Sequence, residues 1–364
     1  MRSFDAHVHC SMKNPVERSI EYYKQICEWN ETEKMAILSI PHSPSFGKCG
    51  SYTQNIKTLF YKLYFAPNFY AFSGLEHPKN ITDEEKLADL FLKQAEAYAL
   101  AGYDGIKMLE GAPILRKDMG IPLHSKVYDK FFAFLEENFI PVTMHIANPS
   151  ENWDINRVSE YAKKNGRFCS SNDLTKAQLH EEVEKVMKKH PKLRLTLAHF
   201  GFWSESIVEA EHFLGDYEYT MLDTTPGGEQ FLHIAERWDE WKPFIDKYQD
   251  RILYGSDVGN HMLEDKAEWK QSVTSRPNLV KYFFCNDDEH KYLGDPQFTY
   301  KGVCLDKTIT EKIFYKNAER EYGNPKPISI EYMLDKISKL KRDYQKDEFE
   351  MQDLLFMENY IKGL

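Results

Sequence analysis

Short runs of β-branched and aromatic residues alternate along the chain with longer amphipathic segments. Eight of these runs are predicted to be strands, and they cover residues 3–9, 34–40, 69–75, 104–109, 141–146, 194–200, 219–224 and 252–257. Regular alternation of strands with amphipathic segments is typical of βα units arranged around a parallel sheet.

Helix start signals lie in the segments between the strands. Thr82 to Glu85 predicts a capping box that begins a helix ending near Gly102, and Thr175 to Gln178 predicts a second that ends before Pro191. Eight βα units within fewer than 300 residues fit a (β/α)₈ TIM barrel better than an open doubly wound sheet. No GxGxxG motif follows the first strand, so a dinucleotide-binding fold has no support.

The end of the chain differs from the rest in composition. Residues 330–364 are highly charged, helical in pattern, and carry an apolar stripe. We therefore divide the chain into a barrel, residues 1–323, and a charged helical C-terminal extension, residues 324–364. The extension offers a surface for a second subunit, so a homodimer is one expectation.

Composition excludes several classes of partner. The net charge of −10 is spread over interspersed acids and bases, which argues against nucleic acid and anionic membranes. No apolar stretch is long enough to span a bilayer, and no signal peptide precedes the first strand. The scattered cysteines form no CxxC pair and predict reduced thiols in a cytoplasmic protein; they are Cys10, Cys27, Cys49, Cys169, Cys285 and Cys304.

The first predicted strand ends in two histidines one residue apart. Side chains alternate along a strand, so His7 and His9 share a face, with Asp5 one layer deeper. The residues expected to face a hydrophobic packing layer are Phe4, Ala6 and Val8. Two imidazoles on one face can bind one metal ion, although an isolated pair among 13 histidines could also arise by chance.

Later strands end in similar residues. His145, His199 and Asp257 lie at the ends of the fifth, sixth and eighth predicted strands. Four of the eight strand ends therefore deliver an imidazole or a carboxylate to one rim, and by this interpretation the other four do not. Three imidazoles with one carboxylate are donors that Zn²⁺ accepts while keeping a position open for water.

These strand ends carry a family resemblance. The motifs FDAHVH, GIKML, VTMHIA, LTLAHFG and ILYGSD resemble those of the amidohydrolase superfamily of metal-dependent (β/α)₈ barrels. AHFG, YGSD and the later IFYKNAER resemble the amidohydrolase-related branch that includes aminocarboxymuconate semialdehyde decarboxylase-like enzymes. The resemblance extends from Met1 to Gly323, and the tail after Pro325 matches no pattern of the family.

The resemblance implies a role for each strand-end residue. His7, His9, His145 and Asp257 would coordinate one divalent metal ion, with zinc first and manganese or iron as alternatives. His199 would stand beside the open position and activate water or polarise the substrate, while Asp257 would also move the proton. A bound divalent ion lowers the pKa of water toward ~7, which suits this chemistry. Asp5 fits a supporting role as hydrogen-bond acceptor for a ligating imidazole.

The fourth strand leaves alternatives open. Lys107 should point inward, where it could bridge two metals as a carbamate, pair with a carboxylate as an ammonium, or bind an anionic substrate. Glu110 at the strand end is a second possible ligand. Residues near the rim that could contact a substrate are His77, Arg116, Trp153 and Arg157. Each of these four could equally be an ordinary loop residue.

The leading interpretation is a metal-dependent hydrolase that cleaves a C–N or C–O bond of a small molecule, which could be a carboxylate. The alternative is a non-oxidative decarboxylase or hydratase acting on a small carboxylic acid, because one metal cage supports several reactions. A third hypothesis is a barrel that binds a ligand without turnover. The complete set of five strand-end residues, His7, His9, His145, His199 and Asp257, argues against that third hypothesis.

Overall fold

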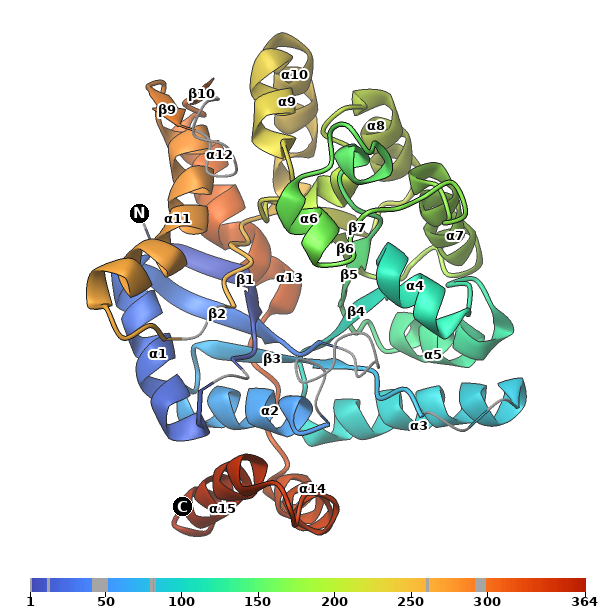
Figure 1. The fold of residues 1–364 in the computed structure, drawn as a ribbon, viewed down its shortest axis with the longest axis vertical. Helices are drawn as coiled ribbons and strands as arrows, with labels where there is room; N and C mark the ends of the chain where they lie inside the picture. Colours follow the sequence, from blue (N-terminus) through green and yellow to red (C-terminus); the bar gives the residue numbers. More distant parts are fainter. Residues whose placement is uncertain are drawn as a thin grey trace.

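Eight parallel strands follow one another in chain order around a single sheet (Figure 1). The computed structural model describes residues 2–11, 14–40, 52–78, 81, 83–259, 262–291 and 299–364. The strands are β1 (Ser3–His9), β2 (Thr32–Leu38), β3 (Phe69–Gly74), β4 (Gly105–Gly111), β5 (Val142–Ile146), β6 (Leu195–Leu197), β7 (Thr220–Asp223) and β8 (Ile252–Leu253). All eight predicted strands are confirmed in position and order.

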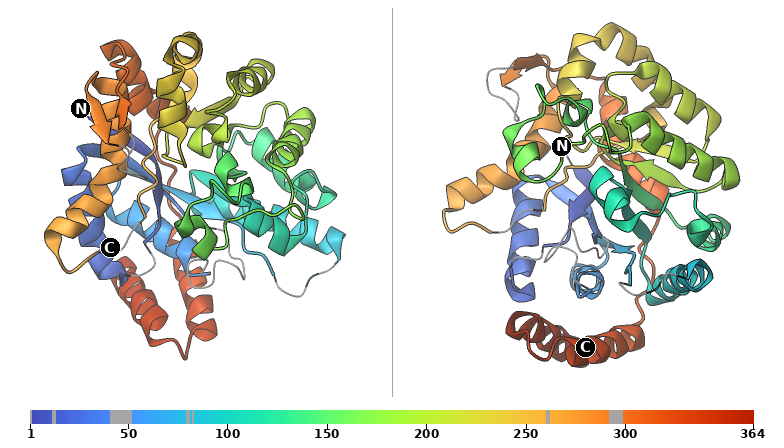
Figure 2. Two further views of the ribbon diagram at one scale, coloured as in Figure 1. Left: turned by 45° about the horizontal axis from the view of Figure 1, so that its top comes forward. Right: turned by 45° about the vertical axis from the view of Figure 1, so that its right-hand side comes forward.

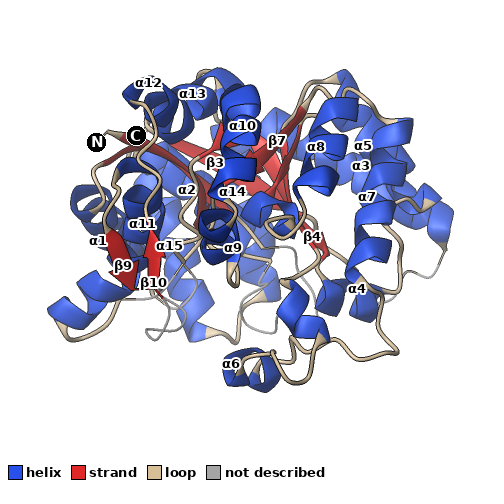
Figure 3. Cartoon of the chain, turned by 90° about the horizontal axis from the view of Figure 1, so that it is seen from above, coloured by secondary structure: helices blue, strands red, loops and turns tan. Residues whose placement is uncertain are grey.

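Hydrogen bonds between β1 and the segment after β8 close the sheet. Ala6 N–H donates to the Tyr254 carbonyl at 2.9 Å, and Asp257 N–H donates to the His7 carbonyl at 2.9 Å. His9 N–H donates to the Val258 carbonyl at 2.7 Å. The first and last strands are thereby joined, and helices surround the resulting barrel (Figure 3). The predicted (β/α)₈ barrel is confirmed.

The helices lie outside the sheet. Those of the barrel are α1 (Val16–Trp29), α2 (Gln54–Tyr64), α3 (Glu84–Ala101), α4 (Pro113–Met119), α5 (Lys126–Glu137), α6 (Glu160–Lys164), α7 (Lys176–Lys189), α8 (Ile207–Asp216), α9 (Gln230–Glu236), α10 (Trp238–Tyr248), α11 (Lys266–Cys285), α12 (Lys307–Glu311) and α13 (Asn317–Tyr322). The predicted capping box at Thr175 is present at the start of α7. Asp83 caps α3, which ends at Gly102 with a positive φ of 94°, whereas Thr82 lies outside the described residues.

Shorter elements complete the fold. They are the helical turns η2 (Ser150–Trp153), η3 (Ala198–Phe202), η4 (Gln249–Arg251) and η5 (Lys312–Lys316), and the hairpin of β9 (Glu289–Lys291) and β10 (Thr299–Lys301). The five described cysteines are free thiols, as predicted, and Cys49 lies outside the described residues. Among the residues that the structure describes, none of the helices has both the length and the apolarity that a bilayer crossing requires.

The core has two layers, one on each side of the sheet. The inner layer contains strand residues together with Tyr315 of η5 and Ala318 of α13, which form a closing segment across one end of the barrel. The strand residues of this layer are Phe4, Ala6, Ala36, Leu38, Tyr70, Phe72, Met221 and Leu253. Alternate strand residues, such as Met35 and Ile37, instead join the cluster formed with the surrounding helices. Because Phe4 and Tyr70 contact Tyr315 and Tyr322, the closing segment plugs the end of the barrel where β1 begins.

The alternation predicted for β1 is wrong in one respect. Phe4 and Ala6 belong to the inner cluster, but Val8 belongs to the cluster shared with the helices. The pairing of β1 with β2 has a register irregularity between Asp5 and Val8. Such a bulge resets which face the following side chains occupy, and hydrophobic patterning alone does not reveal it.

The C-terminal extension forms two helices, α14 (Ile330–Asp343) and α15 (Glu348–Lys362), which lie beneath α2 (Figures 1 and 2). Its apolar stripe is buried against the same chain, through Met333, Ile337, Leu340, Leu354, Met357 and Ile361. Phe60 of α2 contacts the ring of Tyr360 at 5.3 Å. The stripe therefore covers the barrel's own α1 and α2, which explains its pattern without a second subunit.

A buried ion-pair cluster joins the extension to the barrel. Lys57 of α2 is fully buried, and its Nζ lies 2.8 Å from Glu350 Oε2 and 2.8 Å from Asp353 Oδ2. Asp353 Oδ1 also accepts a hydrogen bond of 2.7 Å from the Val16 N–H at the start of α1. One cation thus pairs with two carboxylates that have little access to water.

Replacing Lys57→Met should lower the free energy of unfolding by about 3–5 kcal/mol, because Glu350 and Asp353 would remain buried without a counter-ion. Urea denaturation followed by circular dichroism measures the loss. The triple variant Lys57→Met/Glu350→Gln/Asp353→Asn removes all three charges and should recover most of the stability. Equal destabilisation of the single and triple variants would contradict the electrostatic explanation.

Candidate metal centre

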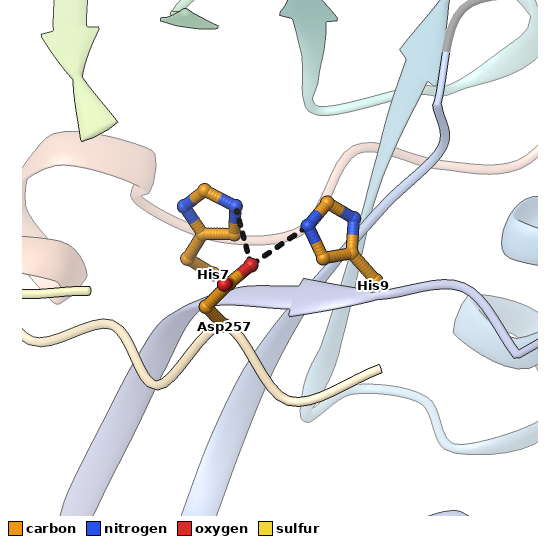
Figure 4. Close-up of side chains that lie close together, drawn as sticks. All are labelled: His7, His9 and Asp257. Atoms are coloured by element: carbon orange, nitrogen blue, oxygen red, sulfur yellow. Dashed lines mark ion pairs between the residues drawn. The ribbon is translucent and has the colours of Figure 1, made fainter. Parts of the chain in front are cut away.

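His7, His9 and Asp257 converge at the carboxyl-end rim of the barrel (Figure 4). One ligand atom from each lies within 4.8 Å of the other two. Asp257 Oδ1 lies 2.8 Å from His9 Nε2 and 3.8 Å from His7 Nε2. The structure thus brings together three of the four residues predicted as metal ligands, from the two strands that close the barrel.

Left-handed backbone turns aim the strand-end side chains. Asp257 and His199 both have φ of 57°, and Ala147, after β5, has φ of 58°. This conformation costs roughly 1–2 kcal/mol for residues other than glycine. It also explains why β6 and β8 are shorter than predicted, since the extended backbone ends before the functional residue. Asp257 is held in its turn by the bond from its N–H to the His7 carbonyl.

Asp223, at the end of β7, is a functional residue that the sequence interpretation missed. Its carboxylate is fully buried and accepts hydrogen bonds from His7 Nδ1 at 2.7 Å and from the His199 N–H at 2.8 Å. Burial by itself would raise the pKa of the Asp223 carboxyl. The interaction with the facing His7 opposes this effect, and the pKa is lowered to about 2. The prediction that only four strand ends deliver such groups is therefore wrong. The signal was present, because Asp223 lies one residue before the end of its predicted strand, as His145 and His199 do.

Asp5 does not bind a ligating imidazole through its described contacts. Its Oδ1 accepts hydrogen bonds of 3.1 Å from the backbone N–H groups of His7 and Ser256. Asp5 therefore fixes the backbone of both halves of the centre, and Asp223 performs the role that Asp5 was predicted to have.

The donor set fits a divalent cation. Burial, followed by the nearby Lys107, lowers the pKa of His7 to about 3, so its imidazole is neutral, the form that binds metals. Because Nδ1 donates to Asp223, Nε2 is the unprotonated nitrogen, and it lies 3.8 Å from Asp257 Oδ1. His9 Nδ1 is buried without a hydrogen-bond partner in the described part of the chain. Two imidazoles and a carboxylate match the preferences of Zn²⁺ and related ions.

His145 and His199 lie side by side, with ring centroids 4.9 Å apart. His145 Nε2 lies 3.0 Å from the Ala147 carbonyl, which leaves Nδ1 as its free nitrogen. A hydrogen bond from the second ring nitrogen to a backbone carbonyl is typical of ligating histidines, although His145 is not among the three most closely grouped ligands. The His199 ring lies 6.1 Å from that of His7.

Lys107 of β4 reaches the centre. Its Nζ is buried and lies 3.1 Å from His7 Nε2, and burial lowers the pKa of Lys107 to about 8. Glu110 has no described hydrogen bond or ion pair with Lys107. Its Oε1 lies instead 2.7 Å from His77 Nε2, so these two predicted site residues pair with each other.

The other predicted substrate contacts are engaged elsewhere. Arg116 binds Glu182 through two guanidinium nitrogens, at 3.0 and 3.1 Å. Trp153 Nε1 donates to the Leu174 carbonyl at 3.0 Å. Arg157 is half-exposed, and its guanidinium lies 3.4 Å from Glu229. None of the three has a described hydrogen bond or ion pair to His7, His9 or Asp257.

Arg276 of α11 is the second residue that sequence reasoning missed. Its guanidinium binds Asp257 Oδ2 and also donates to the Asp257 carbonyl at 3.1 Å. Burial raises the pKa of Asp257, but the adjacent Arg276 and the His9 contact hold it well below its usual range. No strand-end pattern identifies Arg276, because it reaches the centre from a helix.

The chain belongs to the amidohydrolase family, whose model matches residues 80–323. This confirms the family predicted from the strand-end motifs. Amidohydrolases are metal-dependent enzymes that act on small molecules, so that description applies to this protein at the level of the family. A search of curated proteins found no match.

Solved structures with the same fold share little sequence with this chain. An uncharacterised TIM-barrel protein from Bordetella bronchiseptica superposes with a TM-score of 0.54 at 12% identity, over 88% of this chain and 98% of its own. 4-Oxalomesaconate hydratase from Rhodopseudomonas palustris gives 0.53 at 12% identity, over 94% and 99%. 2,6-Dihydroxybenzoate decarboxylase from Rhizobium gives 0.51 at 12% identity, over 88% and 98%. These similarities support the fold.

Asp223→Asn should weaken metal binding by roughly 10–100-fold, because Asn would no longer fix the His7 tautomer with an ionised acceptor. Competition with a chelator, monitored for Zn²⁺, measures the affinity. Asp216→Asn on the exposed surface of α8 is the matched control and should leave the affinity unchanged. An unaltered affinity in a correctly folded Asp223→Asn protein would contradict this role for Asp223.

Proposed function

We propose that the protein is a metal-dependent hydrolase that cleaves a C–N or C–O bond of a small anionic molecule. The observation that carries this proposal is the grouping of His7, His9 and an ionised Asp257 within 4.8 Å at the rim of the barrel. Two imidazole nitrogen donors and a proton-accepting carboxylate are the elements that hydrolysis by activated water requires.

His7, His9, His145 and Asp257 would hold one divalent cation, and zinc suits this mixture of imidazole and carboxylate donors best. When bound, such a cation supplies Lewis acidity and lowers the pKa of a bound water toward ~7. Asp223 and the Ala147 carbonyl fix the ring nitrogens of His7 and His145 that face away from the ligand position.

Asp257 accepts a proton and passes it to the leaving group. Arg276 binds Oδ2 and keeps the carboxylate ionised at neutral pH, while Oδ1 faces His9 Nε2 at 2.8 Å on the side of the centre. Because the Asp257 backbone is also anchored to His7, the carboxylate is held in one position. A base fixed in this way accepts a proton without first reorienting.

His199 assists from the neighbouring strand. Its Nδ1 lies 3.2 Å from the Thr225 carbonyl, to which it donates, so Nε2 is unprotonated and available to substrate or water. Burial lowers the pKa of His199, which keeps the ring neutral. Phe202 stacks on the ring at 4.8 Å and fixes its plane. His199 therefore serves as a second proton acceptor beside Asp257.

Two cations favour a carboxylate-bearing substrate. Lys107 lies against His7, and Arg276 lies against Asp257, so positive charge flanks the centre on both sides. We propose that Lys107 contacts the substrate anion as an ammonium. Of the residues predicted near the rim, His77 and Glu110, the latter on β4, form a pair with each other.

The second candidate function is non-oxidative decarboxylation or hydration of a small carboxylic acid. The observation that favours it is the buried Lys107 ammonium, which would bind a carboxylate close to His7. Two proteins of the same fold are named as a 2,6-dihydroxybenzoate decarboxylase and a 4-oxalomesaconate hydratase, so the fold itself is compatible with either reaction.

Isotope labelling separates the candidate reactions. Zinc-loaded protein is incubated with small carboxylate-bearing lactones and amides, and with aromatic and unsaturated acids, in H₂¹⁸O or D₂O. Hydrolysis would introduce one ¹⁸O into the new acid. Decarboxylation would release CO₂ and place deuterium on the carbon that lost it, whereas hydration would add a whole water. Decarboxylation or hydration without hydrolysis would overturn the leading proposal in favour of the second.

Asp257→Asn should lower turnover of any identified substrate by roughly 10²–10⁴-fold, because an amide cannot accept the proton. Steady-state kinetics of the zinc-loaded variant measures the effect. Asp239→Asn on the exposed face of α10 is the matched control and should retain full activity. An Asp257→Asn enzyme that binds zinc and keeps wild-type turnover would exclude Asp257 as the proton carrier.

A further inference from the structure

A second group of metal-binding side chains lies on the same rim, outside the centre described above. Glu151 of η2, Glu229 before α9 and His233 of α9 each offer a ligand atom within 4.8 Å of the other two. The two segments that carry them follow β5 and β7, so the group joins the loop after His145 to the helix after Asp223.

A small cavity lies between these side chains. Its volume is about 10 Å³, and it is lined by residues that include Glu151, Glu229, His233, Ser204 and Phe202. A cavity of this size admits one water molecule or one ion. Its volume therefore suits a single ion or water molecule.

Glu151 lacks the partner that a buried carboxylate requires. The residue is 7% exposed, and its Oε1 has no hydrogen-bond partner among the residues that the structure describes. A buried carboxylate oxygen without a partner is costly unless a cation or a proton neutralises it. The cavity beside Glu151 is where a cation would meet this need.

His233 is oriented toward the same point. Its Nδ1 lies 3.1 Å from Ser204 Oγ, at hydrogen-bond distance, and its Nε2 lies 3.4 Å from Glu229 Oε2. A histidine fixed through one nitrogen by a neighbouring side chain presents the other as a ligand, as in many metal sites. Ser204 therefore plays for His233 the part that Asp223 plays for His7.

The charges around the cavity leave room for a cation. Lys176 also lines the cavity. It lies 3.5 Å from Glu205 and 2.9 Å from Ser150 Oγ, and its electrostatic interaction with Glu151 is weaker than that with Glu205. Arg157 lies 3.4 Å from Glu229, on the half-exposed side. Three carboxylates, Glu151, Glu205 and Glu229, thus face two cationic side chains, and neither of the two has a described contact with Glu151 Oε1.

We propose that Glu151, Glu229 and His233 form a second divalent-cation site, separate from the centre of His7, His9 and Asp257. Two carboxylates and one imidazole are ligands that Mn²⁺ and Zn²⁺ accept. The site supports the catalytic rim, because Phe202 lines the cavity and stacks on His199 at 4.8 Å. A bound cation clamps the loop after β5 to α9 and so holds Phe202 and Ser204 in position.

Metal titration of the full-length chain with its first site removed tests the proposal. His7→Ala/His9→Ala protein, freed of metal, is dialysed against Mn²⁺ alone, and bound metal is counted. About one equivalent should bind. Adding Glu151→Gln to this background should weaken binding at least about tenfold. Adding Glu209→Gln, an equal charge change on the exposed face of α8, should leave it unaltered.

Thermal unfolding of the same proteins separates a metal site from a structural cluster. Mn²⁺ should raise the Tm of the His7→Ala/His9→Ala protein but not that of its Glu151→Gln derivative. Without metal, Glu151→Gln should keep or raise the Tm, since it removes an unpartnered buried carboxylate. Absence of Mn²⁺ binding in the His7→Ala/His9→Ala background, or binding indifferent to Glu151→Gln, would overturn the proposal and indicate a cavity that holds water. Because the first site is absent, neither result depends on the proposed hydrolysis.

Discussion

One buried carboxylate organises the rim of this barrel. Asp223 accepts hydrogen bonds from His7 Nδ1, from the His199 backbone and from the Thr225 backbone, so the ends of β1, β6 and β7 meet at a single anion. Because the negative charge is fully buried, it is stable only while these donors surround it. The arrangement of three strand ends and the tautomer of His7 are thereby fixed together. Loss of any one donor would leave the remaining charge poorly neutralised.

Barrel closure and site assembly are the same structural event. The bonds between β1 and the segment after β8 complete the sheet, and one of them runs from the Asp257 N–H to the His7 carbonyl. Asp5, between the two segments, accepts from the backbone of both His7 and Ser256. A barrel that failed to close would therefore also separate Asp257 from His7 and His9. The energy of the closed sheet maintains the distance between the ligands.

The sequence was sufficient to predict the eight strands, the barrel and the convergence of His7, His9 and Asp257, because parallel strand ends must meet at one rim. It did not reveal Arg276, Glu229 or His233, whose positions depend on how helices and loops return to that rim. The bulge in β1 was also hidden, since apolar residues face both sides of a barrel strand. Asp223 was missed for a different reason: its strand-end position was visible, but its partner His7 lies 216 residues away.

The packing of α14 and α15 has a consequence for biosynthesis. Lys57 emerges from the ribosome long before its partners Glu350 and Asp353 are made. Likewise, β1 waits for the segment after β8 before its outer edge is paired. Until these later segments are made, the N-terminal βα units remain incomplete, with an open strand edge and a lysine that lacks its carboxylate partners. Until α15 has left the exit tunnel, a nascent chain of this protein therefore lacks the carboxylates that pair with Lys57 and exposes the apolar surface of α1 and α2 that the extension covers.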